Sequence, residues 1–221
     1  MTRSVDLVIF DCDGVLVDSE LPANQVFCEA LRAEGLCVEL ADIVRLLKGL
    51  SLRSCGDVIR REFDLDLSAA FFDRLQKRTY KRFRQELQAV PGVAEAMQAL
   101  SVPYCVASSG SIEKMHFTLG LTNLLRFVDG RLFSASQVPR GKPHPDLFLH
   151  AAQSMAVRPS RCVVVEDSRP GVLAAEAAGM HVLGFAGTSL ADARELADAG
   201  AEVFDDMADL PDLVRARREK S

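Results

Sequence analysis

The hydrophobic residues of this chain alternate between short, nearly charge-free runs and longer stretches with helical periodicity. Apolar runs of strand length are typical of strands that are buried on both faces of a parallel sheet. These runs are Val5–Phe10, Pro103–Ala107, Arg131–Ser134, Cys162–Val165 and His181–Phe185, with a weaker one at Glu202–Phe204. Helical patterns lie between the later runs, at Val93–Leu100, Ile112–Leu119, Pro145–Met155 and Gly171–Ala178. Strands that alternate with helices predict right-handed crossovers and a doubly wound α/β domain.

Residues 17–87 interrupt this alternation, because they contain no strand-like run. Amphipathic helical patterns occupy Asn24–Ala33, Arg53–Glu62 and Ser68–Phe83, and Ser19 supplies an N-cap signal for the first of these helices. A crossover between neighbouring strands needs far less chain than this. We therefore expect two units: an α/β core formed by residues 1–16 and 88–221, and an inserted all-helical subdomain formed by residues 17–87.

Composition narrows the class of protein. Of the 221 residues, 48% are hydrophobic and 26% are charged, which favours a packed core over disorder. The formal net charge of −5 argues against a nucleic-acid binder, so an anionic substrate would need locally arranged cations. No apolar stretch of the sequence reaches membrane-spanning length, and the six cysteines show neither C-x-x-C nor zinc spacing. We therefore expect a cytoplasmic protein with reduced thiols and without a nucleic-acid or membrane partner.

Polar residues follow the predicted strands at their carboxyl ends, where ligands bind in a doubly wound sheet. Asp11 and Asp13 follow the first strand, and Gly14 permits the chain to leave strand geometry there. Taken singly, each polar group has an ordinary explanation as a turn, a helix N-cap, a surface lysine or an acidic cap. Together they place carboxylates, hydroxyls and one cation at strand ends that converge. The further groups are Ser108-Ser109-Gly110, Lys142 and Glu166-Asp167.

These groups together suit phosphoryl transfer. Asp11, Asp13 and Asp167 offer hard oxygen ligands for Mg²⁺, which offsets the repulsion between a carboxylate nucleophile and a phosphate. One carboxylate can attack phosphorus and form an aspartyl-phosphate. The Ser108 hydroxyl, backbone N–H groups at the following helix start and the Lys142 ammonium can hold the phosphate oxygens.

Four motifs in this order resemble the haloacid dehalogenase-like hydrolase superfamily, in its β-phosphoglucomutase-like branch with a helical cap. The resemblance extends over nearly the whole chain and implies a Rossmann-like core with the cap inserted after the first strand. The motifs are Asp11-Cys12-Asp13-Gly14-Val15-Leu16-Val17-Asp18-Ser19, Ala107-Ser108-Ser109-Gly110, Gly141-Lys142-Pro143-His144-Pro145-Asp146 and Val165-Glu166-Asp167-Ser168, which Gly171–Met180 follows.

The resemblance implies a role for each motif residue. Asp11 is expected to be the nucleophile, and Asp13 the acid and base that protonates the leaving alkoxide and later activates water. Mg²⁺ is expected on Asp11, Asp167 and the Asp13 main-chain carbonyl, with Glu166 supporting the metal through water.

Substrate contacts are expected from both units. Ser108 and Lys142 would bind the phosphate, with Ser109 and Gly110 beside them. The string Lys48-Gly49-Leu50-Ser51-Leu52-Arg53 resembles the cap loop that reaches the substrate in this branch, which makes Lys48, Gly49 and Arg53 substrate-binding candidates. An interhelical turn with solvated charges is the alternative for this string.

The motifs favour one reaction over its alternatives. Dehalogenases of the superfamily lack the second aspartate, so Asp13 favours phosphate chemistry. The mutases carry a histidine a few residues after the Asp-Ser pair, whereas this chain reads Leu21-Pro22-Ala23-Asn24 there. We expect a Mg²⁺-dependent phosphatase of a sugar or sugar-acid phosphate, working as a monomer. A phosphosugar mutase is the alternative, and a phospho-aspartate signalling or binding module is a remote one, because receiver domains are about half this length.

Overall fold

In a computed structural model of the chain, which describes residues 5–47, 50 and 52–219, the strands form one six-stranded sheet. Every pairing is parallel, in the order β3-β2-β1-β4-β5-β6. This is the doubly wound parallel sheet that the sequence predicted, and the order of the strands reverses between β1 and β4. The strands are β1 (Leu7–Phe10), β2 (Tyr104–Ser108), β3 (Leu132–Ser134), β4 (Cys162–Glu166), β5 (His181–Phe185) and β6 (Glu202–Phe204).

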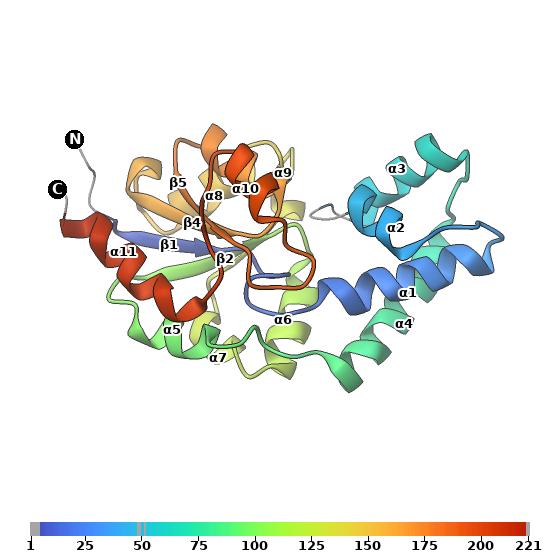
Figure 1. Cartoon of the computed structure of the whole chain (residues 1–221), viewed down its shortest axis with the longest axis horizontal. Coiled ribbons are helices and arrows are strands. Elements are labelled where there is room, and N and C mark those ends of the chain that lie inside the picture. The colour runs from blue at the N-terminus through green and yellow to red at the C-terminus, as the bar shows by residue number, and fades with distance from the viewer. Residues whose placement is uncertain (1–4, 48–49, 51, 220–221) are drawn as a thin grey trace.

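Helices cover both faces of the sheet (Figure 1). Side chains alternate along β1, so Val8 and Phe10 pack on one face while Leu7 and Ile9 pack on the other. All four are fully buried, as the charge-free runs predicted. The first face is covered by α5 (Val93–Ala99), α6 (Ile112–Leu121), α7 (Leu125–Val128) and α11 (Leu210–Glu219), and the second by α8 (Asp146–Ser154), α9 (Arg169–Ala177) and α10 (Ala193–Asp198).

Four helices form a unit beside the sheet, with a hydrophobic core of its own (Figure 1). Phe27, Leu31, Ile43, Ile59 and Phe71 are among its buried residues. This separate core supports our proposal that residues 17–87 form a cap and that residues 1–16 and 88–221 form the α/β core. The helices are α1 (Glu20–Ala33), α2 (Leu40–Leu47), α3 (Leu52–Phe63) and α4 (Ala69–Glu86).

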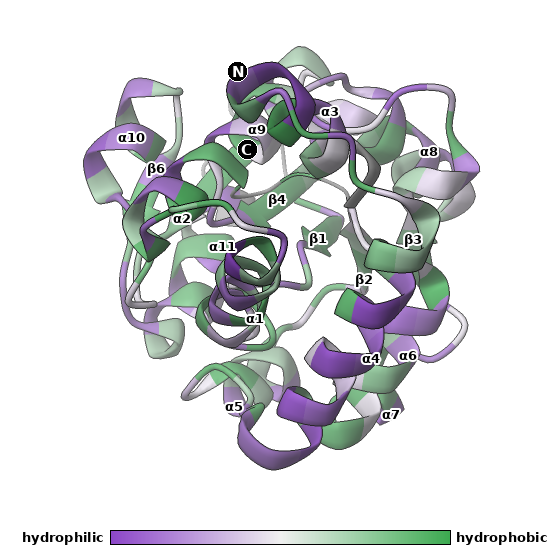
Figure 2. Ribbon diagram, turned by 90° about the vertical axis from the view of Figure 1, so that its right-hand side faces the viewer, coloured by the Kyte–Doolittle hydropathy of each residue, from purple (hydrophilic) through white to green (hydrophobic). Residues whose placement is uncertain are grey.

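The cap is joined to the core at two adjacent places. Val17 forms bridges with both Asp13 and Ala89, so the entering and leaving connections run side by side. Tyr80 of α4 stacks on Phe117 of α6, with 4.3 Å between ring centroids. Much of α4 is hydrophilic, whereas β1 is hydrophobic throughout and β4 is hydrophobic as far as Glu166, its last residue (Figure 2). These contacts place one side of the cap over the carboxyl ends of the strands.

Some elements differ from the sequence prediction. The helices α2, α7, α10 and α11 were not predicted. With four and six residues, α7 and α10 are too short to show a clear helical period. The cap signal at Ser19 marked the start of α1 correctly, because Ser19 occupies its N-cap position, but the Ser19 side chain makes no capping bond. Its hydroxyl contacts Asp13 instead.

Within the described part of the chain, none of the helices combines the length and the hydropathy needed to cross a bilayer.

Candidate active site

The catalytic candidates of β1 lie at the strand's carboxyl end. The Asp11 N–H donates to the Val165 carbonyl at 2.9 Å, which continues the pairing with β4, and the Asp11 residue is buried. Gly14 turns the chain away with φ +79°, and a Cβ at that position would overlap the Asp167 carboxylate. The glycine therefore serves both the turn and the close approach of Asp167 to β1.

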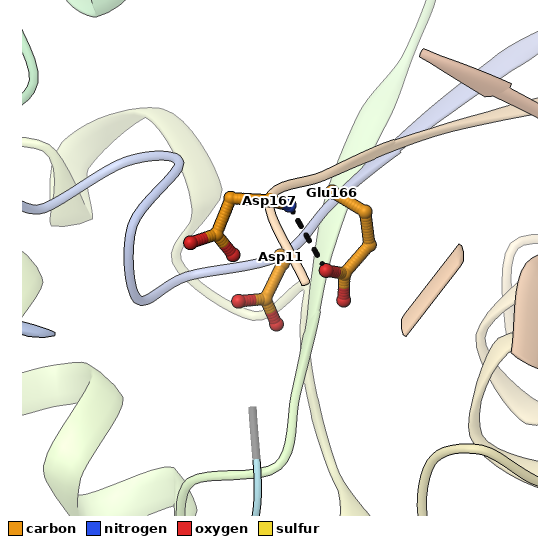
Figure 3. Close-up of side chains that lie close together, drawn as sticks. All are labelled: Asp11, Glu166 and Asp167. Atoms are coloured by element: carbon orange, nitrogen blue, oxygen red, sulfur yellow. Dashed lines mark hydrogen bonds between the residues drawn. The ribbon is translucent and has the colours of Figure 1, made fainter. Parts of the chain in front are cut away.

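Three buried carboxylates meet where the strand order reverses. Asp11, Glu166 and Asp167 each offer a carboxylate oxygen within 4.8 Å of the others, and their side chains converge from the ends of β1 and β4 (Figure 3). Hard oxygen donors in a buried cluster of negative charge fit a cation such as Mg²⁺. Burial raises the pKa of Asp11; Lys142 opposes this effect, and Glu166 and Asp167 reinforce it.

Lys142 inserts its ammonium group into this cluster. Its Nζ lies 2.5 Å from Asp11 Oδ1 and 2.5 Å from Glu166 Oε1, and its side chain is 2% exposed. Burial alone would lower the pKa of Lys142, but the two carboxylates raise it above the usual value, so the lysine stays charged. The lysine that the sequence singled out thus contacts the candidate nucleophile and one candidate metal-supporting carboxylate.

Glu166 is fixed beneath the site by the start of α9. Its Oε2 accepts bonds from the Asp167 N–H at 3.0 Å, the Ser168 N–H at 3.0 Å and the Ser168 hydroxyl at 2.9 Å. Gly171, in the first turn of α9, leaves the space that the Glu166 carboxylate occupies. Figure 3 shows the bond from the Asp167 N–H.

Gly171→Ala is expected to displace Glu166, because the added Cβ would overlap its carboxyl group. Overpacking of this kind lowers the free energy of unfolding by about 1–3 kcal/mol, and we expect that loss in urea denaturation. Gly120→Ala is the matched control, since Gly120, the last residue but one of α6, has open space around an added Cβ. Equal stability of the two variants would contradict the steric role of Gly171.

Asp13 has a separate set of partners. Lys114 Nζ lies 2.8 Å from Asp13 Oδ2, and the Ser19 hydroxyl donates to Asp13 Oδ1 at 2.5 Å. Burial acts to raise the pKa of Asp13, but the Lys114 charge and the hydrogen bonds from Lys114 and Ser19 hold it below the usual value. Asp13 is therefore ionised in this arrangement.

The loop after β2 forms the side of the site next to β1. Ser108 is 1% exposed, and its hydroxyl accepts from the Gly110 N–H at 3.1 Å. The Gly110 carbonyl in turn accepts from the Ser134 hydroxyl at 2.7 Å, which ties the loop to β3. Ser109 and Gly110 precede α6, whose N-cap is Ser111. The loop thus presents hydroxyl and backbone N–H groups beside Asp11 and Asp13.

These groups line a cavity of about 1100 Å³ between the core and the cap. Asp11, Asp13 and Lys142 line its floor, while Glu166 lies beneath it with 0% exposure. Asp167, Ser108, Ser109 and Gly110 also line the cavity. The structure therefore brings together the core residues that the sequence singled out. The cap contributes Glu20, Asn24, Phe27, Leu47, Leu50, Ser54, Cys55, Asp57, Leu75, Gln76, Thr79 and Tyr80 among others.

The cap candidates from the sequence are placed less completely. Lys48 and Gly49 lie outside the described residues, and so does the side chain of Arg53, whose backbone belongs to α3. Their neighbours Leu50 and Ser54 line the cavity. The contacts of these three candidates with substrate remain predictions.

Neither Lys114 nor the contact of Ser19 with Asp13 was predicted from the sequence. Lys114 is the third residue of α6, in the first turn, where the helix dipole disfavours a cation. That unfavourable placement, directly after a candidate phosphate-binding loop, is a signal that could have identified it.

Comparison with known proteins gives a consistent result. A family model described as haloacid dehalogenase-like hydrolase matches residues 5–179. The chain is 30% identical over 214 residues to 6-phosphogluconate phosphatase of Escherichia coli strain K12, covering 96% of both chains. It is 32% identical over 182 residues to hexitol phosphatase A of the same strain, covering 79% of this chain and 80% of that one.

A solved structure shares the fold. It is a conserved haloacid dehalogenase-like protein of unknown function from Agrobacterium tumefaciens strain C58, 37% identical to this chain. The two superpose with a TM-score of 0.83, covering 96% of this chain and 99% of the other.

Proposed function

The chain belongs to the haloacid dehalogenase-like hydrolase family, and from this premise we propose that it is a Mg²⁺-dependent phosphatase of a small phosphorylated metabolite. The observation that carries the proposal is the convergence of Asp11, Asp13, Lys142 and Ser108 on one cavity at the carboxyl ends of β1 and β2 and beside β4. In such a site positioning and charge stabilisation supply most of the rate enhancement for phosphoryl transfer.

In the first proposed step, a carboxylate oxygen of Asp11 attacks phosphorus while the bond between phosphorus and the ester oxygen breaks. Asp13, which is ionised in the substrate-free site, first takes up a proton from solvent and then gives that proton to the departing oxygen, which leaves as an alcohol. The product on the protein is an aspartyl-phosphate at Asp11. Lys142, the Ser108 hydroxyl and the backbone N–H groups near Gly110 hold the phosphate oxygens.

In the second step, Asp13 takes a proton from water, and the water oxygen attacks phosphorus. The bond between Asp11 and phosphorus breaks, which releases inorganic phosphate and restores both aspartates. Asp11, Asp167 and the Asp13 carbonyl would hold Mg²⁺, with Glu166 behind them. When bound, the metal neutralises charge between the nucleophile and the phosphate.

The substrate class follows from the cavity and the relatives. A volume of about 1100 Å³ accommodates a metabolite several carbons long. Asn24, Gln76 and Thr79 bring neutral hydrogen-bonding side chains to the cavity from α1 and α4. Such groups suit the hydroxyls of a sugar, a sugar acid or a polyol, in agreement with the names of the two phosphatase relatives. We propose a substrate of this class.

The alternatives receive less support. Both relatives are named as phosphatases, which favours hydrolysis over a mutase reaction. A phospho-aspartate signalling module is disfavoured, because the cavity extends between core and cap.

We also propose a cytoplasmic monomer without a nucleic-acid or membrane partner. All six cysteines are free thiols, as a reducing compartment requires. Among the described residues, the large hydrophobic side chains exposed at the surface are Leu121 and Leu149, too few for an obligate interface. Light scattering that gave a dimer mass would contradict the monomer.

The experiment that tests the function measures inorganic phosphate released from sugar, sugar-acid, polyol and nucleotide monophosphates. We expect strong release from one of the first three classes in Mg²⁺ and loss of that release in EDTA. Restoration by added Mg²⁺ would separate metal dependence from damage by the chelator. Interconversion of phosphate isomers without release would contradict the phosphatase and favour the mutase.

A further inference from the structure

We propose that Lys114 is a positioning residue that fixes the carboxylate of Asp13 for its two proton transfers; this role rests on the proposed function of Asp13. Lys114 lies outside the motifs by which the sequence resembles the family. Lys114 and Asp13 are 101 residues apart in the sequence, but Lys114 Nζ lies 2.8 Å from Asp13 Oδ2.

The two oxygens of Asp13 are held from two different elements. Ser19, directly before α1, contacts Oδ1 at 2.5 Å, and Lys114, in α6, contacts Oδ2. A carboxylate that is held at both oxygens cannot rotate about its terminal bond without breaking a charge-assisted hydrogen bond. Asp11 forms its ion pair with Lys142 instead, so each of the two catalytic aspartates is paired with a different lysine.

The chemistry of the two partners decides how Asp13 is held. An ammonium group has only donors, whereas a hydroxyl group donates or accepts. Lys114 donates to Oδ2 and the Ser19 hydroxyl donates to Oδ1, so both oxygens of Asp13 accept a hydrogen bond in this arrangement. These two contacts fix the plane of the carboxylate relative to the cavity.

The local fold accommodates Lys114 at a cost. It lies in the first turn of α6, where the helix dipole disfavours a positive charge, and its side chain is 27% exposed. Its own N–H is capped by the Ser111 hydroxyl at 3.1 Å. A lysine that only serves as a solvated surface group has no reason to occupy this unfavourable position. From the first turn of α6, however, the Lys114 ammonium reaches Asp13.

Gly110 provides the space for this contact. A Cβ on Gly110 would lie 3.3 Å from Lys114 Cδ and 3.7 Å from Asp13 Oδ2. The glycine thus lets the lysine stem pass close to the backbone of the candidate phosphate-binding loop. Since Phe117, one turn further along α6, stacks on Tyr80 of the cap, the same helix contacts both Asp13 and the cap.

The test compares two leaving groups in Lys114→Met. An alkyl phosphate, taken from the panel above, needs protonation of its leaving oxygen, whereas para-nitrophenyl phosphate leaves as a stable phenolate. We expect kcat for the alkyl phosphate to fall by about 100-fold or more, the scale of general acid–base catalysis. The first-turnover burst of phenolate should stay within about threefold of wild type, because it does not need the acid. Lys114→Arg should restore part of kcat by supplying a cation.

Two controls make the result specific. Lys77→Met removes an exposed lysine of α4 and should leave both substrates unchanged. Thermal unfolding of Lys114→Met near the wild-type midpoint shows that the variant is folded. Equal losses in the burst and in alkyl-phosphate turnover, or a raised KM with unchanged kcat, would overturn the positioning role in favour of a structural or substrate-binding one.

The orientation of Asp13 is also measured directly, without turnover. Crystals of Lys114→Met should show the Asp13 carboxylate rotated or in two conformers, and an unchanged carboxylate would overturn the proposal. Failure of the proposed function is a distinct result, because it appears in the wild-type protein as an absence of phosphate release. The crystal structure decides the positioning role in either case.

Discussion

Asp11→Asn is expected to abolish phosphate release while the protein stays folded. The amide keeps the size of the side chain and an oxygen for Lys142, but it is not a nucleophile toward phosphorus. Loss of a nucleophile lowers kcat by several orders of magnitude, and we expect a fall of at least about 10⁴-fold. The measurement is phosphate release with the substrate identified in the panel, at saturating Mg²⁺.

A control distinguishes this loss from a general effect of removing a carboxylate. Asp198→Asn changes an exposed aspartate at the end of α10 and should keep wild-type activity. Circular dichroism of Asp11→Asn should match wild type, since the buried side chain keeps its volume. Residual activity above about one per cent would contradict a nucleophilic role for Asp11.

Among the substitutions proposed here, Lys142→Met is expected to cause the largest decrease in the free energy of unfolding. The ammonium is the counter-ion of two carboxylates whose side chains are 9% and 0% exposed. Removing one partner of a buried ion pair leaves uncompensated charge and costs about 3–5 kcal/mol. Urea denaturation of the metal-free protein, before and after the substitution, measures the loss of free energy of unfolding.

A double variant tests the cause of that loss. When Asp11→Asn is combined with Lys142→Met, one of the unpaired carboxylates is removed, so we expect part of the lost stability to return. Lys77→Met should change the free energy of unfolding by less than about 0.5 kcal/mol, as is usual for a surface residue. A loss below about 1 kcal/mol for Lys142→Met would contradict its role as the buried counter-ion.

Much of the fold could be predicted from the sequence, because buried strands of a parallel sheet are local features. The run from Cys162 to Val165 is apolar at every position, and it lies in β4 with every residue buried. Short helices such as α10 escaped prediction, since six residues display little periodicity. Ser19 shows a different limit: it occupies the predicted N-cap position of α1, but its hydroxyl donates to Asp13 instead of capping the helix.

The residues of the candidate site likewise fall into those that the sequence could predict and those that it could not. Asp11, Asp13, Ser108, Lys142 and Asp167 could be proposed from the sequence, because each lies at the carboxyl end of a strand or in the loop after it, where such folds bind ligands. Lys114 could not, because a lysine in a helical pattern is ordinarily a solvated residue.

The sequence by itself therefore determined the strands, the helical insertion and the types of groups available for phosphoryl transfer, all of which are written in short stretches of chain. Only the tertiary structure decided which cation serves which carboxylate. Lys142 lies 131 residues from Asp11 in sequence and Lys114 lies 101 residues from Asp13, yet their ammonium groups are 2.5 Å and 2.8 Å from the respective aspartates. Electrostatic and hydrogen-bonding partners depend on distances of a few ångströms in space, and these distances exist only once the sheet has aligned the ends of its strands.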